Sequence, residues 1–89
     1  MNVDATVLVS DGNAVGGLLA ALFGQDMTGT TRVCATCAHV APLGRHRAYR
    51  GAGIVLRCPS CDAVALVVVE EPGGASVTVS GVLRLGAGS

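Results

Sequence analysis

Four cysteines in two Cys-x-x-Cys pairs are the residues of this chain whose types and spacing best suit chemistry. The pairs are Cys34-Ala35-Thr36-Cys37 and Cys58-Pro59-Ser60-Cys61, and residues 38–57 separate them. Each pair can turn two thiolates toward a common point, and two pairs complete a tetrahedral shell around one Zn²⁺ ion. A shell of four protein ligands leaves no position for substrate or water. We therefore predict one structural zinc ion per chain, bound by Cys34, Cys37, Cys58 and Cys61.

The residues next to each pair affect how its loop closes. In a zinc knuckle, the residue after the second cysteine often adopts a positive φ, for which glycine is the easiest choice. These positions hold Ala38 and Asp62. Aspartate tolerates the left-handed region moderately well, whereas alanine there costs about 1 kcal/mol. Pro59 suits the first turn position, because its ring pre-sets φ.

Three other uses of the cysteines remain open from the sequence. Two disulfides would suit a secreted chain. A rubredoxin-like iron site shares the double Cys-x-x-Cys plan but usually sits in an aromatic-rich core, and Phe23 and Tyr49 are the only aromatic residues of this chain. A thioredoxin-type redox pair opens a helix in an α/β fold, whereas both pairs here lie among strand-like segments. Zinc is favoured over all three.

Two histidines lie near the cysteine pairs in the sequence. His39 follows Cys37 by two residues, and since four cysteines already complete the shell, we expect it to be a partly exposed strand residue. His46 stands among arginines, and we expect it to be solvated rather than a ligand or a catalyst.

Length and composition indicate one small domain, 1–89. A chain of 89 residues buries little apolar surface and usually needs a metal or disulfides for stability. The longest wholly apolar run, 63–69, is far shorter than the roughly 20 residues that span a bilayer. Residues 1–10 contain Asp4 and no lysine or arginine, unlike a signal peptide. We expect a cytoplasmic protein, where reduced thiols more often bind metal than form disulfides.

The expected fold is α+β and mostly β, with an N-terminal amphipathic helix followed by a zinc ribbon of short antiparallel strands. After an N-terminal segment, 1–10, the helix is predicted over 11–24 because apolar residues recur there at helical spacing, with Gly24 at its C-terminal cap. The ribbon and a C-terminal hairpin are predicted over 27–85, with strands at 27–33, 39–43, 54–57, 63–70 and 76–85. Residues 86–89 are predicted to form a frayed tail.

Positive charge is concentrated between the two ends of the chain. The formal net charge is zero, yet residues 27–61 hold five arginines and no acidic residue. We predict that residues 44–57 form an arginine-bearing loop that presents a local basic face, with Tyr49 available for stacking. The candidate partner-binding residues are Arg45, Arg47, Tyr49, Arg50 and Arg57.

Beyond the cysteine motifs, the chain resembles a family of short, uncharacterised bacterial zinc-ribbon proteins that is catalogued as a domain of unknown function. The resemblance rests on Asp11-Gly12-Asn13-Ala14, on both cysteine pairs with Leu56-Arg57 before the second, and on Ser80-Gly81-Val82-Leu83-Arg84-Leu85. It covers most of residues 10–85. The resemblance implies a zinc ribbon and no established activity.

The sequence favours a small structural-zinc-binding protein that acts as a non-catalytic interaction module. Its partner could be an unknown protein or a second copy in a homodimer, and we expect no membrane. The alternatives are a nucleic-acid-binding accessory protein of transcription or translation, and an iron or thiol redox protein. An enzyme is not expected, because the chain has no paired carboxylates, no nucleophile beside a base and no phosphate-binding glycine loop.

Overall fold

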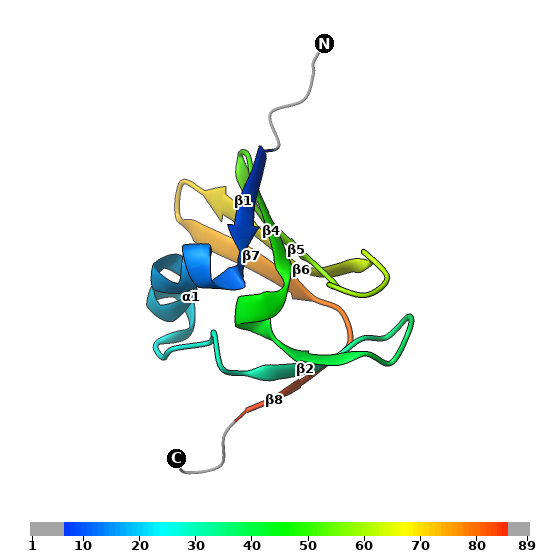
Figure 1. The fold of residues 1–89 in the computed structure, drawn as a ribbon. Helices are drawn as coiled ribbons and strands as arrows, with labels where there is room; N and C mark the ends of the chain where they lie inside the picture. Colours follow the sequence, from blue (N-terminus) through cyan, green and yellow to red (C-terminus); the bar gives the residue numbers. More distant parts are fainter. Residues whose placement is uncertain (1–6, 86–89) are drawn as a thin grey trace.

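Strands rich in β-branched and aliphatic residues build two antiparallel sheets (Figure 1). The structure is a computed structural model and describes residues 7–85. The larger sheet has five strands, in the order β1 (Val7–Asp11), β4 (Arg47–Arg50), β5 (Gly53–Arg57), β6 (Val64–Glu71) and β7 (Gly74–Val79). The smaller sheet has three, in the order β3 (Val40–Pro42), β2 (Thr31–Val33) and β8 (Val82–Arg84). The predicted fold, mostly β with a short N-terminal helix, is confirmed.

The N-terminal helix is shorter than predicted. Strand β1 continues to Asp11, and a 3₁₀ turn, η1 (Gly12–Val15), precedes α1 (Gly16–Phe23). The predicted start is wrong because the Gly12 N–H donates to the His46 carbonyl at 2.8 Å and holds the chain beside β4. Gly24 ends α1 at φ 76°, as predicted. Among residues 7–85, no helix is long and apolar enough to cross a bilayer.

Several predicted strands lie close to their expected positions, and one is wrong. Residues 54–57 and 63–70 correspond to β5 and β6, and the predicted C-terminal hairpin is formed by β6 and β7. The single strand predicted over 76–85 is divided, because the chain leaves the larger sheet after β7 and enters the smaller sheet as β8. Gly81 lies at this crossing with φ 87°. The tail predicted at 86–89 lies outside the described residues.

The segment predicted as an arginine-bearing loop, 44–57, is mostly a β-hairpin. A short 3₁₀ turn, η2 (Leu43–Arg45), leads into β4, and β4 pairs with β5 in regular antiparallel register. The sequence did not show the alternation of buried and exposed side chains along β4, because the buried residue, Ala48, is small and its neighbours Arg47, Tyr49 and Arg50 are polar or amphipathic. The arginines therefore project from a sheet whose position is fixed.

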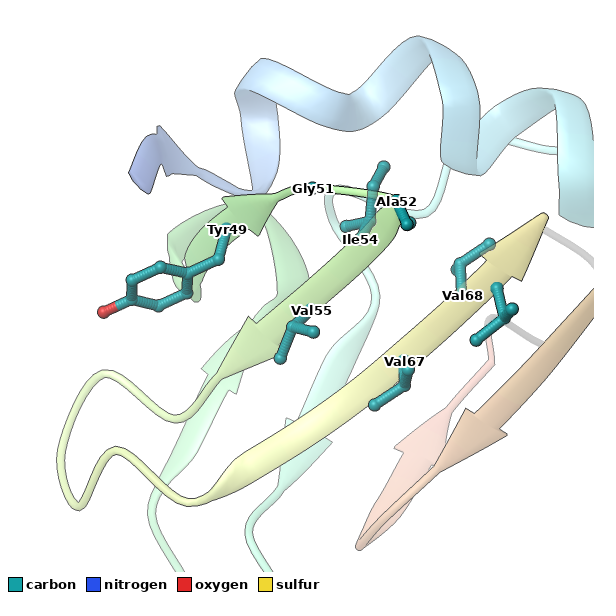
Figure 2. Close-up of a pocket in the computed structure, with 9 residues that line it drawn as sticks. Tyr49, Gly51, Ala52, Ile54, Val55, Val67 and Val68 are labelled. Carbon is teal, nitrogen blue, oxygen red and sulfur yellow. The ribbon is translucent and has the colours of Figure 1, made fainter. Parts of the chain in front are cut away.

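One face of the five-stranded sheet carries the core. Helix α1 and the two 3₁₀ turns contribute Val15, Leu19 and Leu43 to it, and the sheet contributes Ala48, Ile54, Leu56, Leu66 and Val68. The opposite, outer face carries Tyr49, Val55 and Val67, which share a cross-strand row and are only partly buried (Figure 2). The described part of the chain therefore covers the centre of the inner face, over β4, β5 and β6, and leaves the outer face accessible.

Candidate metal centre

The four cysteine sulfurs meet between the two sheets. The first pair lies in the loop that joins β2 to β3, in the smaller sheet, and the second lies in the loop that joins β5 to β6, in the larger sheet. All four Sγ atoms lie within 4.8 Å of one another. The sequence therefore identified correctly the four residues that come together, and the fold shows that the two loops belong to different sheets.

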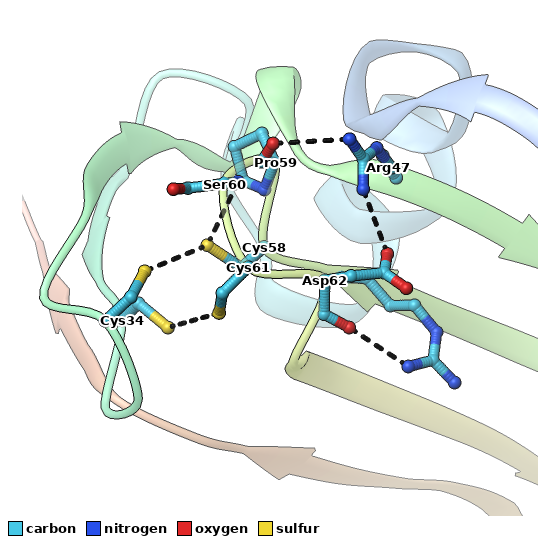
Figure 3. Close-up of polar contacts among 9 residues, drawn as sticks. Cys34, Arg47, Cys58, Pro59, Ser60, Cys61 and Asp62 are labelled. Carbon is cyan, nitrogen blue, oxygen red and sulfur yellow. Dashed lines mark hydrogen bonds and ion pairs between the residues drawn. The ribbon is translucent and has the colours of Figure 1, made fainter.

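The sulfur separations fit a tetrahedral metal site. Cys34 Sγ lies 3.6 Å from Cys61 Sγ, and Cys37 Sγ lies 3.7 Å from Cys58 Sγ (Figure 3). A zinc ion with Zn–S bonds of about 2.3 Å separates its ligand sulfurs by roughly 3.8 Å at the tetrahedral angle. A disulfide requires about 2.05 Å, and all four cysteines are free thiols. The sulfur spacing therefore favours a metal over two disulfides, and the donor set fits Zn²⁺ and does not exclude iron.

The two loops have the same local geometry. In the first, the Thr36 N–H donates to Cys34 Sγ at 3.4 Å, and the Ala38 N–H donates to the Cys34 carbonyl at 3.0 Å. In the second, Ser60 and Asp62 make the equivalent bonds to Cys58, also at 3.4 and 3.0 Å.

The residues that close these turns take the left-handed conformation that the sequence predicted. Ala38 has φ 64° and Asp62 has φ 67°. Ala38 and Asp62 therefore adopt a backbone conformation that glycine adopts more easily. The two matching turns define two cysteine knuckles: 34–38 and 58–62.

The local environment shifts the pKa values of the cysteine thiols in different directions. Backbone N–H groups of Cys37 and Thr36 lower the pKa of the Cys34 thiol to about 5. Burial opposes ionisation of Cys58, yet the N–H groups of Cys61 and Ser60 and neighbouring thiols lower its pKa as well. The N–H of Ala63 favours the Cys61 thiolate, but burial and the three neighbouring sulfurs outweigh it and raise the pKa of Cys61 to about 12. Four thiolates this close need a cation to compensate their charge.

A family model matches residues 4–88, nearly the whole chain. The chain belongs to DUF6510, a family of unknown function. No curated protein and no solved structure matches the chain. The resemblance to an uncharacterised family is confirmed, and membership by itself assigns no activity.

Two of the candidate partner-binding arginines contact the second knuckle. Arg47 Nη1 donates to Asp62 Oδ1 at 3.1 Å, and Arg57 Nη1 donates to the Asp62 carbonyl at the same distance (Figure 3). The Arg57 guanidinium also lies over the Tyr49 ring, 5.8 Å from its centroid. These contacts brace the positive-φ residue that closes the knuckle, so both arginines have a structural role as well as an exposed charge.

The structure does not bring all five candidate residues together. Arg47, Tyr49 and Arg57 share the outer face, because side chains two apart on β4, and cross-strand partners on β4 and β5, point to the same side. Arg50 is exposed and stands on the opposite face, and Arg45 lies in η2, before β4. The outer-face subset therefore comprises Arg47, Tyr49 and Arg57.

His46 is buried, against the prediction that it is solvated. Only 1% of it is exposed, and Nδ1 lies 3.0 Å from the Pro42 carbonyl, to which it donates. Nε2 is then the acceptor for Arg32 Nη1, at 3.3 Å. Burial and the Arg32 charge, opposed by the Pro42 bond, lower the pKa of His46. His39 is exposed just before β3 and is not among the clustered metal-ligand atoms.

Arg32, one of the five arginines in residues 27–61, is buried. It is only 1% exposed, and its Nε donates to the Ser80 carbonyl at 2.7 Å, where the chain crosses between the sheets. Its Nη2 has no hydrogen-bond partner in the described part of the chain. The sequence held no signal for this burial, because it depends on β2 packing against two distant segments.

Proposed function

We propose that this protein is a small, non-catalytic interaction module built around one structural zinc ion. The observation that carries the proposal is the convergence of four cysteine sulfurs, all within 4.8 Å, from two matching knuckles. Cys34, Cys37, Cys58 and Cys61 would fill every position of a tetrahedral ion. Such an ion has no open position for substrate, so its contribution is folding free energy rather than Lewis-acid chemistry.

The outer face of the five-stranded sheet is the surface that we propose for the partner. Tyr49, Val55, Val67 and Val69 line a depression of about 240 Å³, where Gly53 contributes no side chain. Arg57 borders this apolar patch and bonds a backbone carbonyl rather than a carboxylate. An apolar patch bordered by a guanidinium that has no carboxylate partner among the described residues suits a protein segment that is mainly apolar and carries few acidic side chains.

Charge favours a protein partner over nucleic acid. A zinc ion bound by four thiolates carries a net charge of about −2, close to the second knuckle that Arg47 and Arg57 contact. Asp62 already compensates Arg47 through an ion pair at 3.1 Å. Single-strand binders combine a positive groove with several aromatic side chains, whereas Tyr49 is the only aromatic residue on this face of the described sheet.

Metal removal tests the structural half of the proposal. We expect a strong chelator to abolish the cooperative thermal transition, and added Zn²⁺ to restore it, because the ion supplies folding free energy directly. Circular dichroism measures both steps under reducing conditions. An unchanged transition in protein shown to be metal-free would contradict structural zinc.

Peptide display against the outer face tests the interaction half. We expect enriched peptides to combine acidic and apolar residues, and Arg57→Ala and Tyr49→Ala each to weaken their binding by about tenfold or more. The control variant is Glu70→Ala, which removes an exposed side chain on the other face of β6. Equal losses in all three variants, or salt-sensitive retention on DNA instead of peptide binding, would contradict a protein partner at this face.

A further inference from the structure

Strand β7 forms an unprotected edge of the five-stranded sheet. It pairs with β6 on one side, and no described strand lies on its other side. All six residues of Gly74–Val79 are exposed, and none is charged or a proline. Protein edges of this kind are usually guarded by charges, prolines or bulges, because their free N–H and C=O groups otherwise pair with another strand.

The opposite edge of the same sheet carries such a guard. The register between β1 and β4 shifts between Leu8 and Ser10, as in a β-bulge. By contrast, β6 and β7 pair without interruption from Leu66–Val79 to Glu71–Gly74. An uninterrupted, uncharged edge is therefore confined to β7, and the bulged edge at β1 is the poorer template.

The hydrogen-bonding pattern between β6 and β7 determines which backbone N–H and C=O groups of β7 remain unpaired. The Ser80 N–H donates to the Ala65 carbonyl at 2.8 Å, and this pair continues the β6–β7 register. Because alternate residues of an antiparallel strand bond to the same neighbour, Thr78 and Ser76 also bond to β6. The N–H and C=O groups of Ala75, Val77 and Val79 therefore point outward from the sheet.

We propose that β7 pairs antiparallel with β7 of a second copy of this chain, about a two-fold axis at Val77. The free residues are spaced symmetrically about Val77, so the axis places each Val77 opposite its equivalent and each Ala75 opposite Val79 of the other copy. Three bonded pairs supply about six backbone hydrogen bonds. The two five-stranded sheets then form one continuous sheet. This pairing does not depend on the outer-face proposal.

Side-chain size and charge support a second copy as the occupant. The side chains of Ala75, Val77 and Val79 lie on the inner face of the sheet, on the same side as Leu66 and Val68. At the edge, Val77 and Val79 are 38% and 40% exposed. The two-fold arrangement sets a small Ala75 against a larger Val79 and sets no charge against a like charge. A contact of three residue pairs along one strand edge is small, so we expect a weak, concentration-dependent complex.

Oligomeric state and a matched pair of variants test the pairing. Sedimentation velocity of the zinc-loaded protein should show a monomer–dimer equilibrium that shifts with concentration. Val77→Arg should raise the dimer dissociation constant at least about tenfold, because it sets two like charges opposite each other. Thr78→Arg adds the same charge on the other face of β7, where the two-fold axis sets it opposite Ser76 of the other copy rather than opposite its equivalent, and it should change the constant much less. Zinc content confirms that each variant has folded.

Amide hydrogen exchange tests the register in the unaltered chain. The N–H groups of Ala75, Val77 and Val79 should gain protection as the protein concentration rises, whereas those of Ser76 and Thr78 already bond to β6 and should not. A monomer up to about 1 mM would overturn the proposal. A dimer that Val55→Asp weakens more than Val77→Arg would also overturn it, because the contact would then be the outer face.

Discussion

The cysteine ligands are held in place by the backbone of the turns that carry them. Each knuckle directs a backbone N–H at 3.4 Å to its first sulfur and closes on a residue with positive φ, Ala38 or Asp62. This geometry is local, so spacing alone identified the four ligands and both strained positions. The burial of Arg32 and His46 was not predictable in this way, because it depends on the contact of Arg32 with Ser80, 48 residues away, and on the contact between Arg32 and His46, 14 residues apart.

Replacing one ligand tests the residue-scale account. Cys34→Ser should be largely unfolded near room temperature and show no cooperative thermal transition. A shell of three sulfurs would lose much of the folding free energy that a bound zinc ion supplies, which is about 10 kcal/mol or more in small zinc peptides. Thr36→Ala is the control, since it alters the same knuckle and keeps the N–H that bonds the sulfur. Thermal denaturation measures both. A cooperative transition retained in Cys34→Ser would show that the ligand does not hold the fold.

His46 should make stability depend on pH. Its pKa is lowered in the folded state, mainly by burial, so the unfolded chain takes up a proton first as the pH falls below about 6.5. Its contribution is therefore intact above about pH 6.5 and is lost as the pH falls through that value toward the folded pKa, at up to about 1.4 kcal/mol per pH unit.

Urea unfolding at pH 7.5 and 5.5 measures this dependence against a second histidine. The free energy of unfolding should fall less on acidification in His46→Gln than in the unaltered protein. His39→Gln removes only the smallest of the causes that lower the His46 pKa and should keep most of the dependence. Acid also protonates the cysteine thiolates, but this effect is common to the unaltered protein and both variants, so it cancels when their stabilities are compared. Equal losses in the two variants would contradict a titrating His46.

At the scale of elements, the crossing from β7 to β8 decides the architecture. Alternating apolar residues over 76–85 predicted one strand, because periodicity reports strand character and not which sheet a strand joins. Gly81 was the available signal: its φ of 87° favours glycine, and a Cβ there would collide with the Val33 carbonyl oxygen. By contrast, β6 was predicted well because its apolar run, 63–69, is long and is followed by a turn signal at 71–74.

Glycine substitutions test the crossing. Gly81→Ala should destabilise the protein by more than about 1 kcal/mol, because it adds the left-handed penalty to the collision with Val33. Gly73→Ala is the matched control, since a Cβ at Gly73 meets nothing within 4 Å. Chemical denaturation of both variants gives the comparison. Equal stabilities would show that the crossing tolerates a side chain.

At the scale of the whole molecule, the cysteine cluster joins the two sheets. One knuckle connects β2 to β3 in the smaller sheet, and the other connects β5 to β6 in the larger sheet (Figure 1). The chain also passes between the sheets at Ser80–Gly81 and from β3 through η2 to β4, and Arg32 of β2 bonds both Ser80 and His46. A metal bound at this point would stabilise the packing of one sheet against the other, as a chain of 89 residues with a small core usually requires.

Native mass spectrometry of protein purified under reducing conditions, without added metal, tests the central claim most directly. The account predicts one zinc ion per chain. On acidification, the zinc should be lost together with the narrow charge-state distribution of the folded protein. One iron ion per chain would contradict zinc and favour electron transfer at the same four sulfurs. A folded chain without metal, lighter by the four hydrogens lost in forming two disulfides, would contradict the metal centre itself.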